Sequence, residues 1–170
     1  MADIKDPENT LLIETTQGPV VIEMRPDLAP NHVAQIKALA REGAYDGVVF
    51  HRVIDGFMAQ TGDVQFGNSS RPDYNPGRTG TGGSNRPDLK QEFSAEPHVR
   101  GVASMARSSN PNSANSQFFI CFDDARFLDR QYTVWGKVIA GMENVDKIKR
   151  GEPVRDPDKM ISVRVAADAA

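Results

Sequence analysis

The order of periodic segments constrains the fold of this chain more than any other feature of the sequence. Apolar and polar residues alternate over 10–16 and 19–25, on either side of Gln17-Gly18, which predicts a β-hairpin. Only two segments have helical periodicity, and most of the β-type runs lie between them, so alternating β-α-β units are absent. This order favours a closed antiparallel barrel or a sandwich whose open ends are covered by the helices. The remaining β-type runs are 48–61, 100–107, 117–122, 132–139 and 160–166.

Apolar residues spaced three or four apart predict the two helices. The first spans 30–43, with Pro30 near its start and Gly43 placed to end it. The second is predicted over 142–149, with Gly151 as its stop. The residues expected to face the core are Val33, Ile36, Leu39 and Ala40 in the first helix and Met142, Val145 and Ile148 in the second.

A long segment over 64–92 is rich in Gly, Pro, Asn and Ser and has no periodicity. A stretch of this length within a small domain is typical of a binding loop or of partial disorder. It contains GTGGSN at 80–85, which lacks the G-x-x-x-x-G-K-[ST] spacing of a phosphate-binding loop. We interpret it as a glycine-rich turn with left-handed backbone positions.

Composition and charge indicate an ordinary globular protein of one domain. The 170 residues, 39% hydrophobic and 25% charged, can bury a core without a disulfide or a metal. The 23 acidic and 20 basic residues give a net charge of −3 with no basic cluster, so neither nucleic acid nor a membrane is an expected partner. No window approaches the roughly 18 apolar residues of a membrane span, and the acidic N-terminus does not resemble a signal peptide. With a single cysteine, Cys121, no intrachain disulfide can form, and we expect a cytoplasmic protein.

The sequence contains no motif for nucleophilic, metal or phosphate chemistry. His32, His51 and His98 have no ligand-like spacing, and neither G-x-S-x-G nor H-E-x-x-H occurs. Cys121 lies in the apolar run FFICF, where a thiol usually packs as a small hydrophobic group. We therefore expect no metal and no cofactor, which directs attention to reactions that need neither.

One segment, FHRVIDGFMAQTGD at 50–63, gathers side chains of a kind that could form such a site. Asp55-Gly56 predicts a hairpin turn in its middle. Pairing of the two flanking strands would place an arginine and a glutamine beside two large apolar side chains, namely Arg52, Gln60, Phe57 and Met58. Taken alone, the segment is equally compatible with a half-buried strand that carries one snorkelling arginine.

Two further segments change that balance: SMARSSNPNSANSQFFICF at 104–122 and DARFLDRQYTVWGKV at 124–138. Together with FHRVIDGFMAQTGD and TGTGGSN, they resemble the cyclophilin family of peptidyl-prolyl cis-trans isomerases. The resemblance runs from the first hairpin to the last strand and is closest to compact, cytosolic bacterial members. It implies a single isomerase domain over 1–170, folded as a mainly β, closed eight-stranded antiparallel β-barrel capped by two α-helices.

The resemblance also implies a role for individual residues. Arg52 stands at the position of the catalytic arginine, and Gln60 at that of the glutamine that orients it and contacts the peptide. Gly80 would edge the neighbouring pocket for the residue before proline. The walls of the pocket for the proline ring are implied at Phe57, Met58, Phe119 and Leu128. The peptide groove is implied at Ala106, Arg107 and Gln117.

Three positions in the groove depart from the best-known eukaryotic members. Phe127 replaces a tryptophan, Tyr132 a histidine and Arg107 an asparagine, and the loop over 107–116 is one residue longer. Members that have the tryptophan hold the cyclic peptide cyclosporin tightly through the indole N–H, a donor that phenylalanine lacks. We therefore expect Phe127 to line the groove rim and cyclosporin to bind weakly.

The residues suit a reaction that makes and breaks no covalent bond. Rotation about an Xaa-Pro bond crosses a barrier of about 18–20 kcal/mol because twisting destroys the amide resonance. The twisted nitrogen regains a lone pair, to which an arginine can donate, so no general base is required. The expected partners are proline-containing unfolded or partly folded polypeptides, and the expected oligomeric state is a monomer.

Two alternatives stay open at this stage. The first is a proline-motif binding module or holdase that uses the same groove without catalysis, although binding alone would not need Arg52. The second is a hydrolase or nucleotide-binding enzyme that uses GTGGSN at 80–85.

Overall fold

The first hairpin forms where the alternating residues predict it. In the computed structural model, which describes residues 4–169, β1 (Thr10–Thr15) pairs antiparallel with β2 (Gly18–Met24), and Thr15 lies opposite Gly18. Alternation places every second residue on the buried face. The residues that the hairpin contributes to the core include Leu11, Ile13, Val20 and Ile22.

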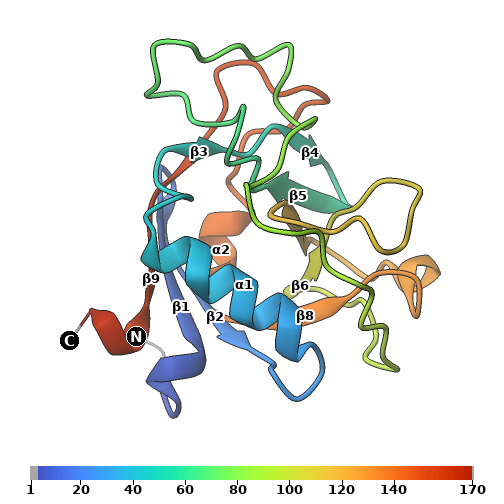
Figure 1. The fold of residues 1–170 in the computed structure, drawn as a ribbon. Coiled ribbons are helices and arrows are strands. Elements are labelled where there is room, and N and C mark those ends of the chain that lie inside the picture. Colours follow the sequence, from blue (N-terminus) through green and yellow to red (C-terminus); the bar gives the residue numbers. More distant parts are fainter. Residues whose placement is uncertain (1–3, 170) are drawn as a thin grey trace.

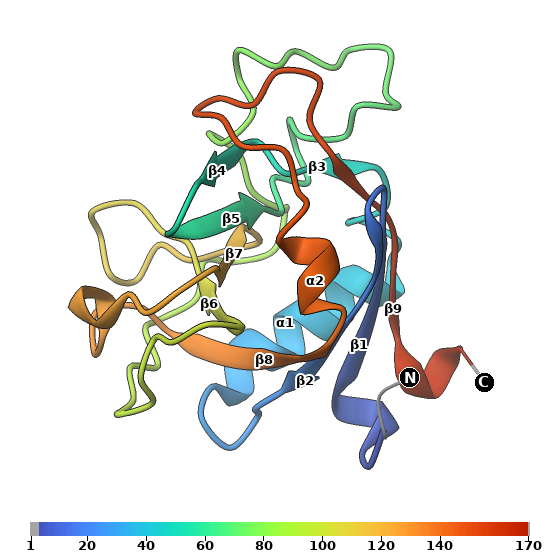
Figure 2. The same ribbon diagram turned by 180° about the vertical axis from the view of Figure 1, so that it is seen from behind.

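Seven more strands continue the sheet within residues 4–169. They are β3 (Val48–Val49), β4 (Arg52–Ile54), β5 (Met58–Thr61), β6 (Val102–Met105), β7 (Phe118–Cys121), β8 (Val134–Ala140) and β9 (Lys159–Val165). Each pairing between these strands is antiparallel, and their order is β3-β9-β1-β2-β8-β6-β7-β5-β4. The sheet is strongly curled, as Figures 1 and 2 show from opposite sides.

The closed eight-stranded barrel implied by the resemblance is wrong for this structure. The nine strands of the described chain form an open, curled sheet with β3 and β4 at its two ends. The reason lies at Phe50 and His51, where the β-type run of residues 48–54 is interrupted. Val48 and Val49 pair with β9, whereas the Phe50 N–H donates to the Asp158 carbonyl and the His51 carbonyl accepts from Val154. The loop before β9 therefore supplies the backbone partners at the break. As a result, β3 and β4 are two separate end strands rather than one continuous strand that would close the barrel.

The two helices lie where the apolar spacing predicts them, although the second is shorter than expected. α1 (Pro30–Arg41) buries the four apolar residues predicted for it, and Gly43 follows its end with φ +74°. α2 (Met142–Val145) is a single turn, because the N–H groups of Lys147 and Ile148 bond carbonyls three residues back rather than four. In Figure 1, α1 crosses in front of the curled sheet, and α2 lies nearer the viewer in Figure 2. Among the described residues, no helix is long and apolar enough to cross a membrane.

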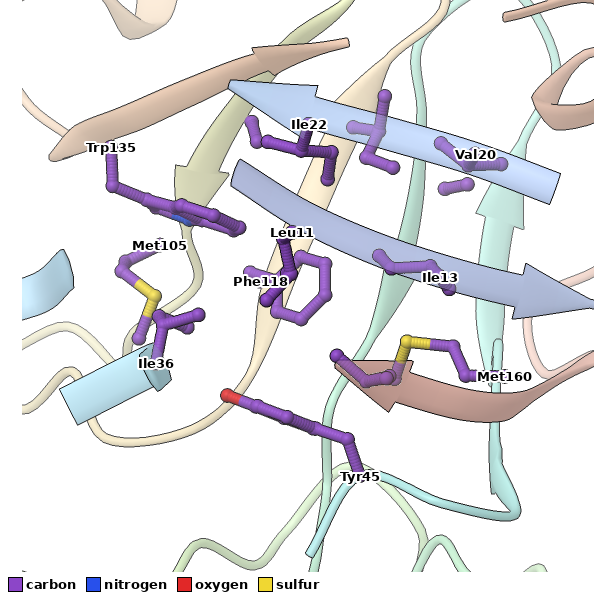
Figure 3. Packing of buried hydrophobic residues seen from close by; sticks show 14 of the residues in the cluster. Leu11, Ile13, Val20, Ile22, Ile36, Tyr45, Met105, Phe118, Trp135 and Met160 are labelled. Carbon is purple, nitrogen blue, oxygen red and sulfur yellow. The ribbon is translucent and has the colours of Figure 1, made fainter. Parts of the chain in front are cut away.

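The centre of the main core is an aromatic group around Phe118 of β7. Tyr45 and Trp135 contact its ring edge to face, with centroids 5.7 and 5.2 Å away. The Tyr45 hydroxyl donates to the Ser116 carbonyl at 2.8 Å, which satisfies the one polar atom of this buried ring. Figure 3 shows Phe118 between side chains of the first hairpin, α1 and the strands opposite.

A second, smaller apolar cluster lies on the other face of β5 and β7. Along β7, Phe118 and Ile120 point into the main core, while Phe119 and Cys121 point into the second cluster. The buried members of this cluster are Met58, Phe119, Cys121, Ala125 and Leu128. Burial raises the pKa of the Cys121 thiol to about 12, so the free cysteine packs as an apolar side chain, as its sequence context predicts.

The two ends of the described chain meet beside α1. Short 3-10 helices at Pro7–Asn9 and Ala166–Asp168 lie in contact. Arg41 of α1 joins them, with Nη2 2.8 Å from a Glu8 carboxylate oxygen and Nε 2.9 Å from an Asp168 oxygen. Figures 1 and 2 show both ends next to β1 and β9.

Phe118→Ala should lower the free energy of unfolding by about 3–5 kcal/mol, since it opens a cavity between two aromatic neighbours. Urea denaturation of the variant and the wild type measures this difference. Ile161→Ala is the matched control on an exposed position of β9, where the change should stay within about 0.5 kcal/mol. Equal losses in the two variants would contradict the packing described here.

Candidate active site

A row of directly opposed residues crosses four strands on the face that carries the second cluster. Arg52 of β4 lies opposite Gln60 of β5, Gln60 opposite Phe119 of β7, and Phe119 opposite Ser104 of β6. Opposed residues of antiparallel strands point to the same face of a sheet. The residues one position along the same strands belong instead to the main core: Val53, Ala59 and Ile120.

A chain of hydrogen bonds runs from Arg52 to the loop over 80–82. Arg52 Nη1 donates to Gln60 Oε1 at 3.2 Å, and Gln60 Nε2 donates to Gln117 Oε1 at 3.0 Å. Gln117 Nε2 donates to the carbonyls of Gly80 and Gly82 at 3.0 and 2.9 Å. Because those carbonyls can only accept, the Gln117 oxygen must face Gln60, and the Gln60 oxygen must then face Arg52.

Ten of the twelve predicted site residues line one cavity of about 390 Å³. They are Arg52, Phe57, Met58, Gln60, Gly80, Ala106, Arg107, Phe119, Leu128 and Tyr132. Gln117 lines a neighbouring hollow of about 320 Å³, which shares Gly80 and Arg107 with the first. Phe127 does not line either cavity.

Aromatic side chains form the walls of the larger cavity. Phe119 is buried and contacts Tyr132 edge to face at 5.9 Å. Phe57 packs against Phe127 with ring centroids 5.5 Å apart. Phe127 belongs to a short 3-10 turn at Arg126–Leu128, and it is 67% exposed. Its contact with Phe57 therefore places it on the outer rim beside the cavity.

Arg107 closes the cavity on the side of Tyr132. Its guanidinium lies 4.4 Å from the Tyr132 ring centroid, and Nε and Nη2 donate to the Gln131 carbonyl at 3.1 and 2.6 Å. The Ala106 N–H donates to the Gln117 carbonyl at 3.0 Å, which sets the register in which the longer 107–116 loop leaves β6. The cation–π contact and these bonds hold Arg107 at the boundary between the two hollows.

Asp63 is buried and lines neither hollow, but it holds the loop over 80–82 in place, a role that sequence reasoning did not single out. One carboxylate oxygen accepts from the Gly80 N–H at 2.7 Å and from the Gly82 N–H at 3.0 Å. The other accepts from the backbone N–H groups of Gln65 and Phe66 at 3.0 and 2.9 Å. The predicted glycine-rich turn is therefore tied down by a carboxylate within the protein. The signal was present, since Asp63 ends the motif FHRVIDGFMAQTGD.

Five cavity-lining residues were likewise missed: His51, Thr79, Thr81, Glu152 and Pro153. The last two lie about a hundred residues from Arg52 in the sequence, yet Glu152 Oε2 accepts from Arg52 Nε at 2.5 Å. No local pattern in the sequence could have indicated this contact.

His51, the residue before Arg52, is buried and packs against Gly80. A Cβ at position 80 would approach the His51 ring to 3.0 Å, and the backbone there has φ +102°, so glycine suits this position for two reasons. Burial lowers the pKa of His51 to about 4, with Asp63 opposing the shift and Arg52 adding to it. The imidazole is therefore neutral at physiological pH.

Ser104, His98 and Asp129 meet under Phe119, but their arrangement does not favour nucleophilic catalysis. The buried Ser104 hydroxyl donates to the Thr133 carbonyl at 2.9 Å. His98 Nε2 lies 2.9 Å from the same Ser104 oxygen, and Asp129 Oδ1 lies 3.2 Å from His98 Nδ1. Ser104 and His98 are fully buried and line neither hollow of the site, so a substrate could not reach the hydroxyl. Nor do residues 4–169 contain a group of three His, Cys, Asp or Glu side chains that could hold a metal ion.

A family model described as "Cyclophilin type peptidyl-prolyl cis-trans isomerase/CLD" matches residues 10–167. The chain belongs to the cyclophilin family. The family is one of isomerases, and the match spans every strand of the sheet.

Similar proteins agree with this assignment. A Brucella suis protein named "Probable peptidyl-prolyl cis-trans isomerase" is 62% identical, over 98% of this chain and 87% of its own length. The crystal structure of cyclophilin AquaCyp293 from Hirschia baltica has a TM-score of 0.83 at 33% identity, over 97% of this chain and 76% of that one. A Cryptosporidium parvum cyclophilin, crystallised in the presence of the dipeptide Ala-Pro, has a TM-score of 0.78 at 26% identity, over 92% of this chain and 98% of that one.

The low pKa of His51 should make this cyclophilin less stable as the pH falls from 7 to 5. The unfolded imidazole binds a proton near pH 6.5, whereas the folded one does so only near pH 4, so protonation in this window favours the unfolded state. The expected loss is about 2 kcal/mol from His51. Burial also lowers the pKa values of His32 and His98, which act in the same direction.

Denaturant midpoints measured between pH 5 and 7 check this expectation. His51→Asn should flatten the pH dependence while His32 and His98 keep part of it. A slope unchanged by the substitution would show that His51 is already solvated in the folded protein.

Proposed function

We propose that this cyclophilin accelerates cis–trans rotation about Xaa-Pro bonds in unfolded or partly folded polypeptides and so assists their folding. The observation that carries the proposal is Arg52, held by Gln60 at the edge of a cavity with aromatic walls. The crystal structure of the Cryptosporidium parvum relative in the presence of the dipeptide Ala-Pro supports a proline-containing substrate.

In the proposed mechanism, the apolar side chains hold the proline ring while the preceding peptide group rotates. Phe119, Met58 and Leu128 are buried and line the cavity, so they exclude the water that stabilises the planar amide. Arg52 donates to the proline nitrogen when twisting returns its lone pair. Gln60 orients the arginine.

The barrier to Xaa-Pro rotation is low enough for one donor and an apolar cavity to account for the acceleration. At a barrier of about 20 kcal/mol the uncatalysed rate is roughly 0.01 per second. Lowering the barrier by about 7 kcal/mol would accelerate the step about 10⁵-fold. One charge-assisted donor in a site without water is of the right order for that reduction.

We further propose that residues 1–170 act as one isomerase domain and as a monomer. The cytoplasm is the proposed compartment, since the one cysteine is buried and free and folding needs no disulfide. Gly80 and Gln117 line the hollow next to the proline cavity, which we assign to the residue before proline.

The purified chain should accelerate cis-to-trans conversion of an Ala-Pro tetrapeptide in a protease-coupled assay, with no added metal or nucleotide. EDTA should leave the rate unchanged, because no step of the proposal uses a metal. Peptide binding without acceleration would instead identify a binding module, and loss of activity with chelator would overturn the mechanism.

Arg52→Ala should lower kcat/KM by about tenfold or more, because it removes the proposed donor. The melting temperature should change little, since Arg52 is half-exposed. Arg71→Ala is a matched control: it removes a similarly exposed arginine from a surface pair with Asp73. Wild-type turnover in the Arg52 variant would show that another group acts as donor.

Phe127→Trp should tighten cyclosporin binding by about 5- to 150-fold, the effect of one hydrogen bond to an otherwise unpaired ligand carbonyl. Turnover should change little, because Phe127 lies on the exposed rim rather than in the cavity lining. Titration of the drug against both proteins gives the two inhibition constants. Equal constants would remove position 127 from the proposed drug contact.

A further inference from the structure

The segment between α2 and β9 forms an arch opposite Arg52. Between the two bonded positions on either side, β4 has one residue, Arg52, whereas the arch has two, Glu152 and Pro153. The backbone bonds that frame it pair Gly151 with Val53, at 2.8 Å in both directions, and the Val154 N–H with the His51 carbonyl, at 3.1 Å. The extra residue leaves the plane of pairing, as in a β-bulge, and Glu152 and Pro153 line the cavity.

Side chains fix the arch on its approach from α2. The Arg150 guanidinium lies 4.1 Å from the Phe122 ring centroid and donates to the Asp146 and Ile148 carbonyls at 2.6 and 2.7 Å. A Cβ on Gly151 would lie 2.8 Å from the Val154 Cα, so the turn into the arch has no room for a side chain. The backbone therefore determines where Glu152 lies.

Arg52 is held at two edges of its planar group. Nε donates to Glu152 Oε2 at 2.5 Å, and Nη1 donates to Gln60 Oε1 at 3.2 Å. None of the hydrogen bonds among residues 4–169 uses Nη2, which is left for a bound group. Two anchors on different edges fix both the position and the plane of a guanidinium.

We propose that Glu152 is a positioning residue for Arg52, an inference that rests on the proposed function. The carboxylate takes the Nε–H, so that the guanidinium enters the transition state already oriented toward the proline nitrogen. The pair is 41% and 58% exposed on its two sides, and a pair so exposed contributes little to folding. Glu152 contributes to catalysis instead: because it holds the guanidinium in place beforehand, Arg52 loses less rotational entropy when the peptide twists.

Three single variants test this role with the Ala-Pro tetrapeptide. Glu152→Ala should lower kcat about three- to tenfold with KM unchanged, because the anchor acts on the transition state. Glu152→Gln should keep most of the activity, since its amide oxygen can accept the same hydrogen bond. Asp73→Ala is the matched control: Asp73 is an exposed carboxylate that pairs with an arginine, Arg71, and lines neither hollow of the site, so turnover should match the wild type.

A double variant separates positioning from an effect on the fold. In an Arg52→Ala background, adding Glu152→Ala should cause no further loss, because the group that it orients is gone. The same fractional loss in both backgrounds would overturn the role, and so would a kcat that rises in the Ala and Gln variants. An active wild type with unaffected Glu152 variants would overturn this role alone, whereas an inactive wild type would overturn the proposed function and the role with it.

Discussion

Strand β7 is buried on both faces, and the rest of the molecule is arranged around that constraint. Phe118 anchors the main core through Tyr45 and Trp135, while Phe119, its neighbour in sequence, is a wall of the cavity. A strand has only two residues per repeat, so any shift of β7 that repacked the core would also move the wall. The stability of the domain and the shape of its cavity are therefore properties of the same four residues.

The polar half of the site depends on acceptors that cannot change their role. The carbonyls of Gly80 and Gly82 fix the amide of Gln117, and through Gln60 they fix the orientation of Arg52. Asp63 in turn holds the N–H groups of the same two glycines. The orientation of the half-exposed Arg52 guanidinium therefore depends, through a loop with no regular structure, on a buried carboxylate. A long loop of this kind can be as well defined as a strand when its backbone groups are bonded one by one.

Local signals in the sequence predicted the first hairpin and α1 because turn residues and apolar spacing act over a few positions. The family motif brought together ten cavity residues, although their roles are proposals. What the sequence could not predict depends on distant partners. The interruption at Phe50 and His51 exists because the loop before β9 supplies their backbone bonds, and this opens the predicted barrel. Glu152 accepts a hydrogen bond from Arg52, which is 100 positions away in the sequence. α2 ends early because the next backbone N–H groups bond carbonyls three residues back, which the spacing of apolar residues does not indicate.

The contact between the two terminal 3-10 helices has an architectural consequence. The described chain therefore begins and ends at one corner of the domain, beside Arg41 and the strands β1 and β9. That corner is several strands away from β4 and β5 in the order of the sheet, and both ribbon views place it apart from the short orange turn between β7 and β8. A protein attached at either end of the described chain would therefore lie away from the groove and leave it open to a polypeptide.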